Sequence, residues 1–185
     1  MRLDSGAARR VFPPQWLADD PQAGAIDIPW REAEPVAPEA ICVCSRDALV
    51  HQGYMTGALQ RSRHCRLRIR RLWQRHDARR LERLILLLDE GQRSHVAAWI
   101  RIELLAFEPR WKRRLVESDL PFGAILEQAG IRPAFADRRY FRLPRLFPWS
   151  GMLAYRRCCG DHYGRGHRML GEDGRLLAEV REVLP

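Results

Sequence analysis

The segment from Leu84 to Leu104 constrains the fold more than any other part of the chain. An unbroken apolar run, Leu84 to Leu88, leads into the turn-forming sequence Asp-Glu-Gly. After the turn, residues 99–104 alternate branched apolar side chains with Trp, Arg and Glu. A short apolar run is typical of a buried strand, and strict alternation indicates a strand with two different faces. The segment therefore predicts a hairpin inside an antiparallel sheet.

Similar strand patterns lie before and after this hairpin. The other strand candidates are residues 65–73, 137–147, 152–159 and the two halves of 166–185, which meet at a Gly-Glu-Asp-Gly turn. Between the strands, residues 51–63 and 109–131 favour short helices. Strands joined in hairpins, with helices clustered between them, predict an α+β fold with an antiparallel sheet.

Proline content divides the chain into two parts. Residues 1–50 hold half of its 12 prolines, so we interpret them as a proline-rich N-terminal arm of turns and extended pieces. Residues 51–185 form the folded domain. No stretch approaches the roughly 20 apolar residues that span a membrane, and residues 1–20 lack the apolar core of a signal peptide. We therefore expect no membrane span and a cytoplasmic location.

The formal net charge of +9 first suggests a nucleic-acid partner. Lys112 is the only lysine among 32 basic residues, however, and such a bias toward arginine is expected of a GC-rich genome. We therefore do not expect nucleic acid as a partner. A basic nucleic-acid-binding protein stays the alternative from a different class, with the arginines of residues 65–80 around Trp73 gripping phosphates. The five cysteines form no zinc pattern, so we expect no metal.

Two charged residues stand out because strand alternation places them among apolar side chains. Glu182 shares a row with Val180 and Leu184, and Arg83 shares strand parity with Ile85. One interpretation is an internal salt bridge between Arg83 and Glu182. The other is a cavity in which the arginine anchors a carboxylate and the glutamate acts as a hydrogen-bonding or acid–base group.

A third feature is the sequence Leu-Pro-Phe-Gly at residues 120–123. Proline and glycine around Phe122 predict a tight turn at the start of a helix. Free backbone N–H groups point outward there and hydrogen-bond carboxylates. An ordinary helix entry is the alternative interpretation.

Taken in order, these features resemble the bacterial chorismate pyruvate-lyase family. Five short matches within residues 51–185 carry the resemblance. They are Met55-Thr56 at an early helix start, Arg83 at the opening of an apolar strand, Leu120 to Gly123 as the turn, Tyr163 to Arg168 opening the last hairpin, and Glu182 in the terminal strand. The chain departs from the family at Ala97 and Ala98, near a place where a charged residue is usual.

The resemblance implies a single antiparallel β-sheet with flanking helices that enclose a buried ligand cavity. It implies a carbon–oxygen lyase without cofactor that eliminates pyruvate from chorismate to give a hydroxybenzoate, with 4-hydroxybenzoate as the first choice, for ubiquinone or aryl secondary-metabolite biosynthesis. Arg83 and Glu182 are the implied catalytic residues. Arg83 holds the ring carboxylate together with the N–H of Phe122, while Met55 and Gly123 complete the implied substrate-binding set.

A non-catalytic sensor of the same fold is the alternative function. Its partner is again a small aromatic carboxylate, such as chorismate or a hydroxybenzoate, and only turnover distinguishes it from the lyase. The departure at Ala97 and Ala98 keeps this alternative open. The sequence makes no prediction of the oligomeric state.

Overall fold

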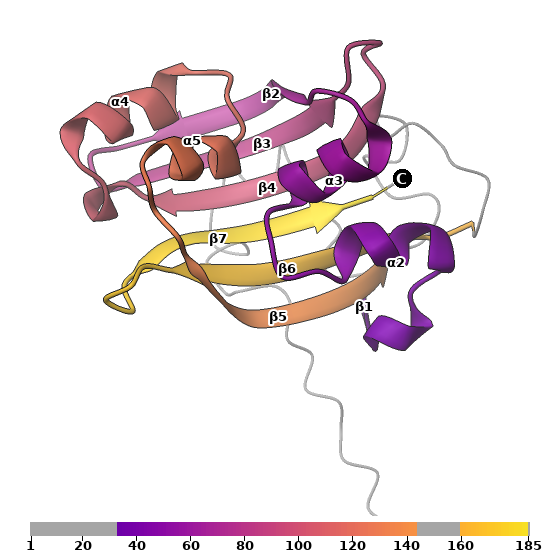
Figure 1. Ribbon diagram of the computed structural model, residues 1–185. Helices are drawn as coiled ribbons and strands as arrows, with labels where there is room; N and C mark the ends of the chain where they lie inside the picture. Colours follow the sequence, from indigo (N-terminus) through magenta and orange to yellow (C-terminus); the bar gives the residue numbers. More distant parts are fainter. Residues whose placement is uncertain (1–32, 144–159, 185) are drawn as a thin grey trace, which may run out of the picture.

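The predicted central hairpin is present, and further strands extend it on both sides. A computed structural model describes residues 33–143 and 160–184, and within these residues seven strands form one antiparallel sheet (Figure 1). The order across the sheet is β1-β5-β6-β7-β4-β3-β2. The strands are β1 (Glu34–Val36), β2 (Arg68–His76), β3 (Arg80–Leu88), β4 (Ser94–Glu103), β5 (Ala134–Leu143), β6 (His162–Leu170) and β7 (Leu176–Val183).

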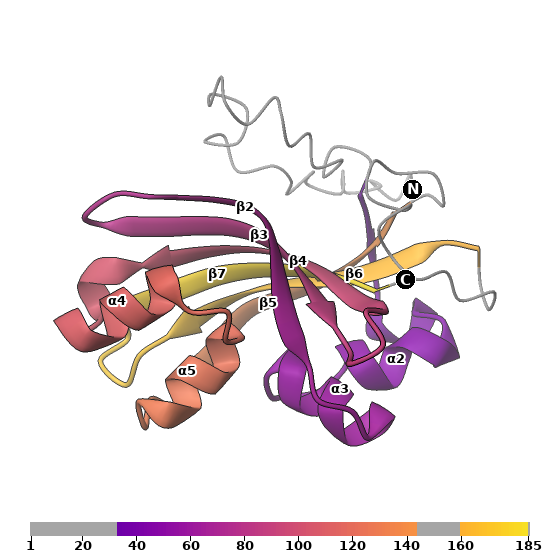
Figure 2. The ribbon, with the colours of Figure 1, turned by 90° about the horizontal axis from the view of Figure 1, so that it is seen from above.

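The α-helices of the described residues all lie on one side of the sheet (Figure 2). They are α2 (Val43–Leu49), α3 (Met55–Arg63), α4 (Pro109–Glu117) and α5 (Phe122–Gln128), with the short 3₁₀ turns η3 (Pro38–Ala40) and η4 (Leu104–Ala106). Pro109 begins α4, where its missing N–H costs nothing. Among the described residues, no helix is long and apolar enough to cross a membrane. The predicted α+β class with a single antiparallel sheet is confirmed.

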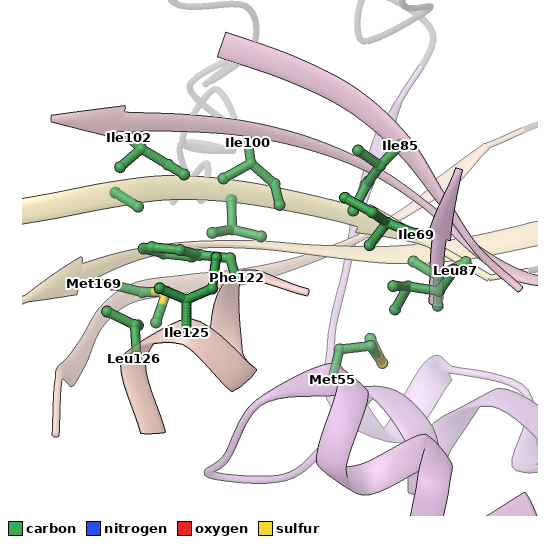
Figure 3. Packing of buried hydrophobic residues seen from close by; sticks show 14 of the residues in the cluster. Met55, Ile69, Ile85, Leu87, Ile100, Ile102, Phe122, Ile125, Leu126 and Met169 are labelled. Atoms are coloured by element: carbon green, nitrogen blue, oxygen red, sulfur yellow. The ribbon is translucent and has the colours of Figure 1, made fainter. Parts of the chain in front are cut away.

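The main hydrophobic core lies between the sheet and the helices (Figure 3). Alternate residues of the central strands point into it, among them Ile85 and Leu87 from β3 and Ile100 and Ile102 from β4. Phe122, Ile125 and Leu126 of α5 meet them from the helix side. The intervening strand residues form a second apolar cluster on the opposite face, which includes Leu84, Leu86 and Trp99. The two clusters explain why the run from Leu84 to Leu88 is apolar throughout.

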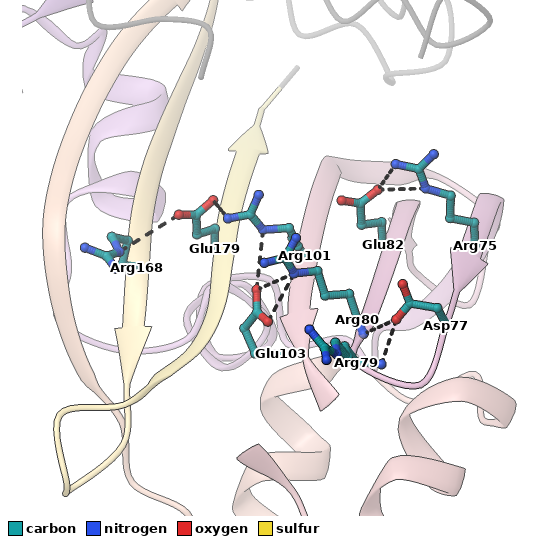
Figure 4. Close-up of polar contacts among 9 residues, drawn as sticks. All are labelled: Arg75, Asp77, Arg79, Arg80, Glu82, Arg101, Glu103, Arg168 and Glu179. Carbon is teal, nitrogen blue, oxygen red and sulfur yellow. Dashed lines mark hydrogen bonds and ion pairs between the residues drawn. The ribbon is translucent and has the colours of Figure 1, made fainter. Parts of the chain in front are cut away.

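The face away from the helices also carries a row of alternating charges across five strands. Arg75, Glu82, Arg101, Glu179 and Arg168 face one another in turn from β2 to β6. Arg75 donates to Glu82 at 2.8 Å, and the guanidinium of Arg101 lies 2.9 Å from the carboxylate of Glu179 (Figure 4). Opposite charges on facing strands stabilise that pairing, and a slip of one residue would bring the row to the core face. This row therefore helps to fix the register of these five strands.

The described part of the N-terminal fifty residues is more regular than the sequence predicted. Residues 33–50 were expected to be turns and extended pieces, but they contain the helix α2 and the strand β1, which pairs with β5. The strand candidate at residues 152–159 lies outside the described residues. Asp119, which precedes α5, forms an ion pair with Arg71 at 2.9 Å, and α5 begins without a side-chain cap.

Gly164 lies where two strands and an aromatic ring meet closely. A Cβ at this position would lie 2.4 Å from the Phe141 ring and 2.5 Å from the backbone oxygen of Glu182. Since one of these neighbours is backbone, the clash cannot be relieved by turning a side chain. Gly91, in the β3–β4 turn, is a useful contrast, because a Cβ there would only touch Asp89 at 3.4 Å.

We expect Gly164→Ala to lower the free energy of unfolding by about 3 kcal/mol, because overpacking forces β6 away from its neighbours. Gly91→Ala is the matched control and should change stability by less than about 0.5 kcal/mol. Urea denaturation of both variants measures the difference. Equal stability of the two variants would contradict the close approach at Gly164.

Candidate functional site

The floor of the candidate site is a patch of the helix-facing side of the sheet. Residues of β3, β4, β7 and β6 face one another there in three neighbouring rows. From β3 to β6 the rows are Leu81, Ile102, Ala178 and Met169; Arg83, Ile100, Val180 and His167; and Ile85, Ala98, Glu182 and Arg165. The apolar members belong to the main core, so the charged residues in the same rows point toward the helices as well.

A cavity opens over these rows, and its volume of about 40 Å³ has room for a few water molecules. Its polar floor residues are Arg165, His167 and Glu182, and most of the remaining lining is apolar or aromatic. Ala98 also lines it, at the position where Ile85 and Glu182 are its strand neighbours. Its small side chain leaves room between them.

The roof of the cavity is formed by the starts of two helices. Met55 and Thr56 begin α3, and Phe122 and Gly123 begin α5. A Cβ on Gly123 would lie 2.9 Å from the ring of Tyr54, so glycine allows the two helix starts to pack closely. Neither helix has a side-chain cap. An α-helix leaves its first backbone N–H groups without internal partners, and no cap side chain satisfies them in α3 or α5.

Glu182 forms a buried ion pair, but its partner is Arg165 and not Arg83. Nε of Arg165 donates to Oε2 of Glu182 at 2.7 Å, and both residues are buried. The other guanidinium nitrogens of Arg165 donate to the backbone oxygens of Leu49 at 3.1 Å and Gly53 at 3.3 Å. Nη1 also lies 3.0 Å from Nε2 of His51. Arg165 thus joins the floor to the segment that leads into α3.

Two histidines near this pair are held in the neutral form. Burial, followed by the charges of Arg165 and Arg138, lowers the pKa of His167 to about 2. The same causes in the same order lower the pKa of His51 to about 4. His167 packs against Phe135 with 5.3 Å between the ring centroids, and its Nδ1 is buried without a hydrogen-bond partner. The site therefore contains neutral imidazole at physiological pH.

Arg83 is fully buried, and most of its guanidinium nitrogens have no hydrogen-bond partner. Its Nη1 donates to the backbone oxygen of Leu115 at 3.4 Å, whereas Nε and Nη2 have no hydrogen-bond partner. Burial and the nearby charge of Arg71 lower the pKa of Arg83 to about 10, while Asp119 raises it. At neutral pH the guanidinium still carries its charge, in a place where little compensates it.

Four of the five residues predicted for the site line the cavity: Met55, Phe122, Gly123 and Glu182. Arg83 does not line it, although its strand neighbour Ile100 does. The helix-facing direction expected for Arg83 and Glu182 is observed, but the salt bridge considered between them is absent. Arg83 and Glu182 lie two strands apart, in neighbouring rows, and contact different residues.

Sequence reasoning missed Arg165 and His167 as site residues. Alternation within Tyr163 to Arg168 places both on one face of a strand, and this signal was available. It was not decisive, because only strand pairing shows that this face lies beside Glu182. In the described residues, no group of three or more His, Cys, Asp or Glu is arranged to hold a metal ion.

The sequence matches no protein-family model and no curated protein sequence. Solved structures do share the fold. PhnF from Mycobacterium smegmatis is similar with a TM-score of 0.56 at 10% identity over 74% of this chain and 65% of that one, and the effector domain of PhnF gives 0.54 at 11% identity over 74% and 90%. The ligand-binding domain of a putative GntR-family transcriptional regulator from Bordetella bronchiseptica gives 0.49 at 12% identity over 64% and 85%. The chain thus spans just under two thirds of the PhnF structure.

These likenesses confirm the fold and correct the expected activity. The chain has the chorismate lyase-like fold, as the resemblance implied. The prediction of a chorismate pyruvate-lyase is wrong, because the solved structures that share the fold are PhnF and its effector domain. The geometry is consistent with this correction: Glu182, expected as an acid–base group, is already engaged by Arg165 at 2.7 Å.

The buried ion pair leads to a stability prediction. Glu182→Ala leaves the Arg165 guanidinium buried without its counter-charge, so we expect the free energy of unfolding to fall by about 3–5 kcal/mol. Glu34→Ala, which removes an exposed partner of Arg142, is the control and should have no measurable effect. Urea denaturation measures both. A loss below about 1 kcal/mol for Glu182→Ala would contradict a structural role for the pair.

The neutral histidine leads to a prediction about pH. His167 has a pKa of about 2 in the folded state and 6.5 as its ordinary value, so between these values the unfolded chain binds a proton that the folded chain does not. Its contribution to stability is therefore complete above pH 6.5 and is lost as the pH falls toward 2. The slope reaches about 1.4 kcal/mol per pH unit.

We expect His167→Phe to flatten the dependence of unfolding free energy on pH below 6.5, measured by urea denaturation from pH 7.5 to 4.5. His51, whose folded pKa is about 4, has the same sign and leaves part of the slope in place. His76→Gln, at an exposed position, is the control. An unchanged slope in His167→Phe would contradict a buried neutral imidazole.

Proposed function

We propose that the domain is a non-catalytic binding module that holds a small aromatic carboxylate in the cavity between its sheet and the starts of α3 and α5. One solved structure of similar fold is the effector domain of PhnF. This likeness supports a sensing role over an enzymatic one. The carboxylate is the finer part of the proposal and comes from the charges around the cavity.

The observation that carries the proposal is the unpaired guanidinium of Arg83. An arginine buried without a counter-charge costs free energy, whereas its fork matches a carboxylate in two parallel hydrogen bonds. Nε and Nη2, the two unpartnered nitrogens, are one such pair of donors. Arg83 lies directly across from Ile100, a residue of the cavity floor. Arg83 itself does not line the cavity, so the proposal requires the side chains beside Ile100 to shift on binding and let a carboxylate reach the guanidinium.

The roof supports an anion at the same end. Phe122 and Gly123 follow the α4–α5 connection, which contains Asp119, a residue close enough to influence the charge of Arg83. Backbone N–H groups of Phe122 and Gly123 would add to the hydrogen bonds of the guanidinium. The carboxylate is held by fixed donors, without a metal or cofactor.

The rest of the cavity suits a ring. Phe122 and Phe135 line it together with Met55, Ile100 and Val180, and such a lining favours a flat apolar body. Glu182 gives no reason to expect turnover, because Arg165 engages it and in turn holds the backbone of Leu49 and Gly53. Moving a proton at Glu182 would disturb the contacts that position the roof.

Binding and stability should respond in opposite directions to Arg83→Met. Without ligand, the variant removes an uncompensated buried charge, so we expect the free energy of unfolding to rise by about 2 kcal/mol. The affinity for benzoate, measured by titration calorimetry, should fall about 100-fold, since two charge-assisted hydrogen bonds are lost. Benzamide, which is neutral and of the same shape, should bind weakly to both proteins.

Arg71→Met is the matched control, because Arg71 is a neighbouring cation on β2 that pairs with Asp119 and does not line the cavity. It should keep benzoate affinity within about threefold. Undiminished benzoate binding by Arg83→Met would contradict the proposed anchor. Release of pyruvate from chorismate by the wild-type protein would contradict the non-catalytic function.

A further inference from the structure

Strand β2 forms one edge of the sheet and is strongly basic (Figure 1). Among the described strands it pairs with β3 alone, so the backbone N–H and C=O groups on its other side have no strand partner. Residues 61–80 contain nine arginines and a single acidic residue, Asp77. Within the described residues, β2 contributes nothing to the cavity lining. A function of this edge is therefore separate from the function of the cavity.

Two arginines of β2 depart from the charge pairing of the outer face. Arg75, on this face, has Glu82 as its cross-strand neighbour and donates to it at 2.8 Å (Figure 4). Arg68 and Arg70 lie opposite leucines of β3 instead. Both are exposed, and neither side chain forms a hydrogen bond or an ion pair in the described part of the chain. Since β3 supplies no counter-charge here, an added strand at the free edge is the place from which one can come.

An extended acidic peptide complements this edge. A strand laid beside β2 places its side chains opposite Arg68, Ile69 and Arg70, and opposite charges in such cross-strand pairs are stabilising. Ile69 points into the main core, so an apolar residue suits the position across from it. The edge thus fits the order acidic, apolar, acidic. The regular register of β2 ends at Arg71, just before an irregularity, so the added strand is short.

Two other occupants fit the edge less well. A second copy that paired through the same residues of β2 would set arginine against arginine, and like charges directly opposite are destabilising. A nucleic-acid strand offers phosphate oxygens, which accept hydrogen bonds but do not donate them, so the free C=O groups of β2 would gain no partner. A peptide strand supplies both donors and acceptors along the edge.

We propose that the free edge of β2 is a docking site for an extended acidic segment of a partner protein. The segment adds a strand to the sheet and places carboxylates at alternate positions, opposite Arg68 and Arg70. Main-chain hydrogen bonds to β2 hold the segment, and the two arginines select its sequence. The site shares no residue with the cavity.

Short labelled peptides and fluorescence anisotropy at physiological salt test the charge and the alternation. The peptide Thr-Val-Glu-Val-Glu-Val-Thr should bind about tenfold more tightly than its glutamine counterpart, which lacks both cross-strand ion pairs. Thr-Val-Val-Glu-Glu-Val-Thr, which directs its glutamates to opposite faces, should bind about threefold more weakly than the alternating peptide. N-methyl groups on both glutamates, or on the central valine, distinguish strand addition from attraction alone. One of these two peptides should lose binding and the other should keep it, because alternate N–H groups face β2.

Charge reversal on the protein tests the two arginines. Arg68→Glu combined with Arg70→Glu should weaken binding of the alternating acidic peptide about 30-fold, since two attractive pairs become repulsive. The same variant should prefer the matching lysine peptide. Arg113→Glu combined with Arg114→Glu, at exposed positions of α4, is the control of equal charge and should keep the affinity within about threefold.

Equal losses in the two double variants would show attraction by net charge and overturn the docking site. Equal affinity for the glutamate and glutamine peptides, or binding that survives both N-methylations, also overturns it. Tighter binding of oligothymidylate than of the acidic peptide favours nucleic acid instead, and a wild-type dimer that the Arg68 and Arg70 reversal dissociates favours a second copy. Either result rejects the acidic segment. Benzoate binding is measured separately, so failure of this inference leaves the proposed function standing.

Discussion

The buried ion pair between Arg165 and Glu182 is the contact on which the cavity depends. Glu182 brings a carboxylate to the middle of an apolar sheet face, and Arg165 compensates it from the next strand. The remaining donors of the same guanidinium hold the backbone oxygens of Leu49 and Gly53. Because α3 begins two residues after Gly53, one side chain sets both the charge of the floor and the place where the roof starts.

Strand register then decides which groups meet. The same strands carry the rows under the cavity on one face and the charge row on the outer face, with Glu82, Arg101 and Glu179. A slip by one residue would move the outer charges into the core, so the outer face resists it. The same constraint aligns Arg83 with His167 across β4 and β7, and it places Ala98 beside Glu182, where its small side chain leaves the hollow.

The sequence predicted strands in the regions of β2 to β7, the antiparallel sheet and the inward direction of Arg83 and Glu182, because alternation is a local property that burial enforces. It did not predict β1 or α2, since Ala48 and Leu49 of α2 are buried by packing against α3 and β6, which the local sequence does not show. It also paired Glu182 with the wrong arginine among its alternatives. Arg83 and Arg165 both share a strand face with apolar residues, and only the strand order puts Arg165 next to Glu182. The prediction of lyase activity failed for a related reason. A shared order of short motifs reflects the fold, whereas activity depends on what each charged side chain contacts.

The two buried arginines differ in how many hydrogen-bond partners their guanidinium groups have. Arg165 uses its donors on Glu182 and on backbone oxygens, which is how a protein keeps a buried charge for its own stability. Arg83 is equally buried and has a single 3.4 Å contact to Leu115. His95 and His167 repeat the contrast, one paired and one not. A core selected for stability alone would replace Arg83 and His167 by apolar residues of similar volume. In the function that we propose, a bound carboxylate supplies the partner that Arg83 lacks.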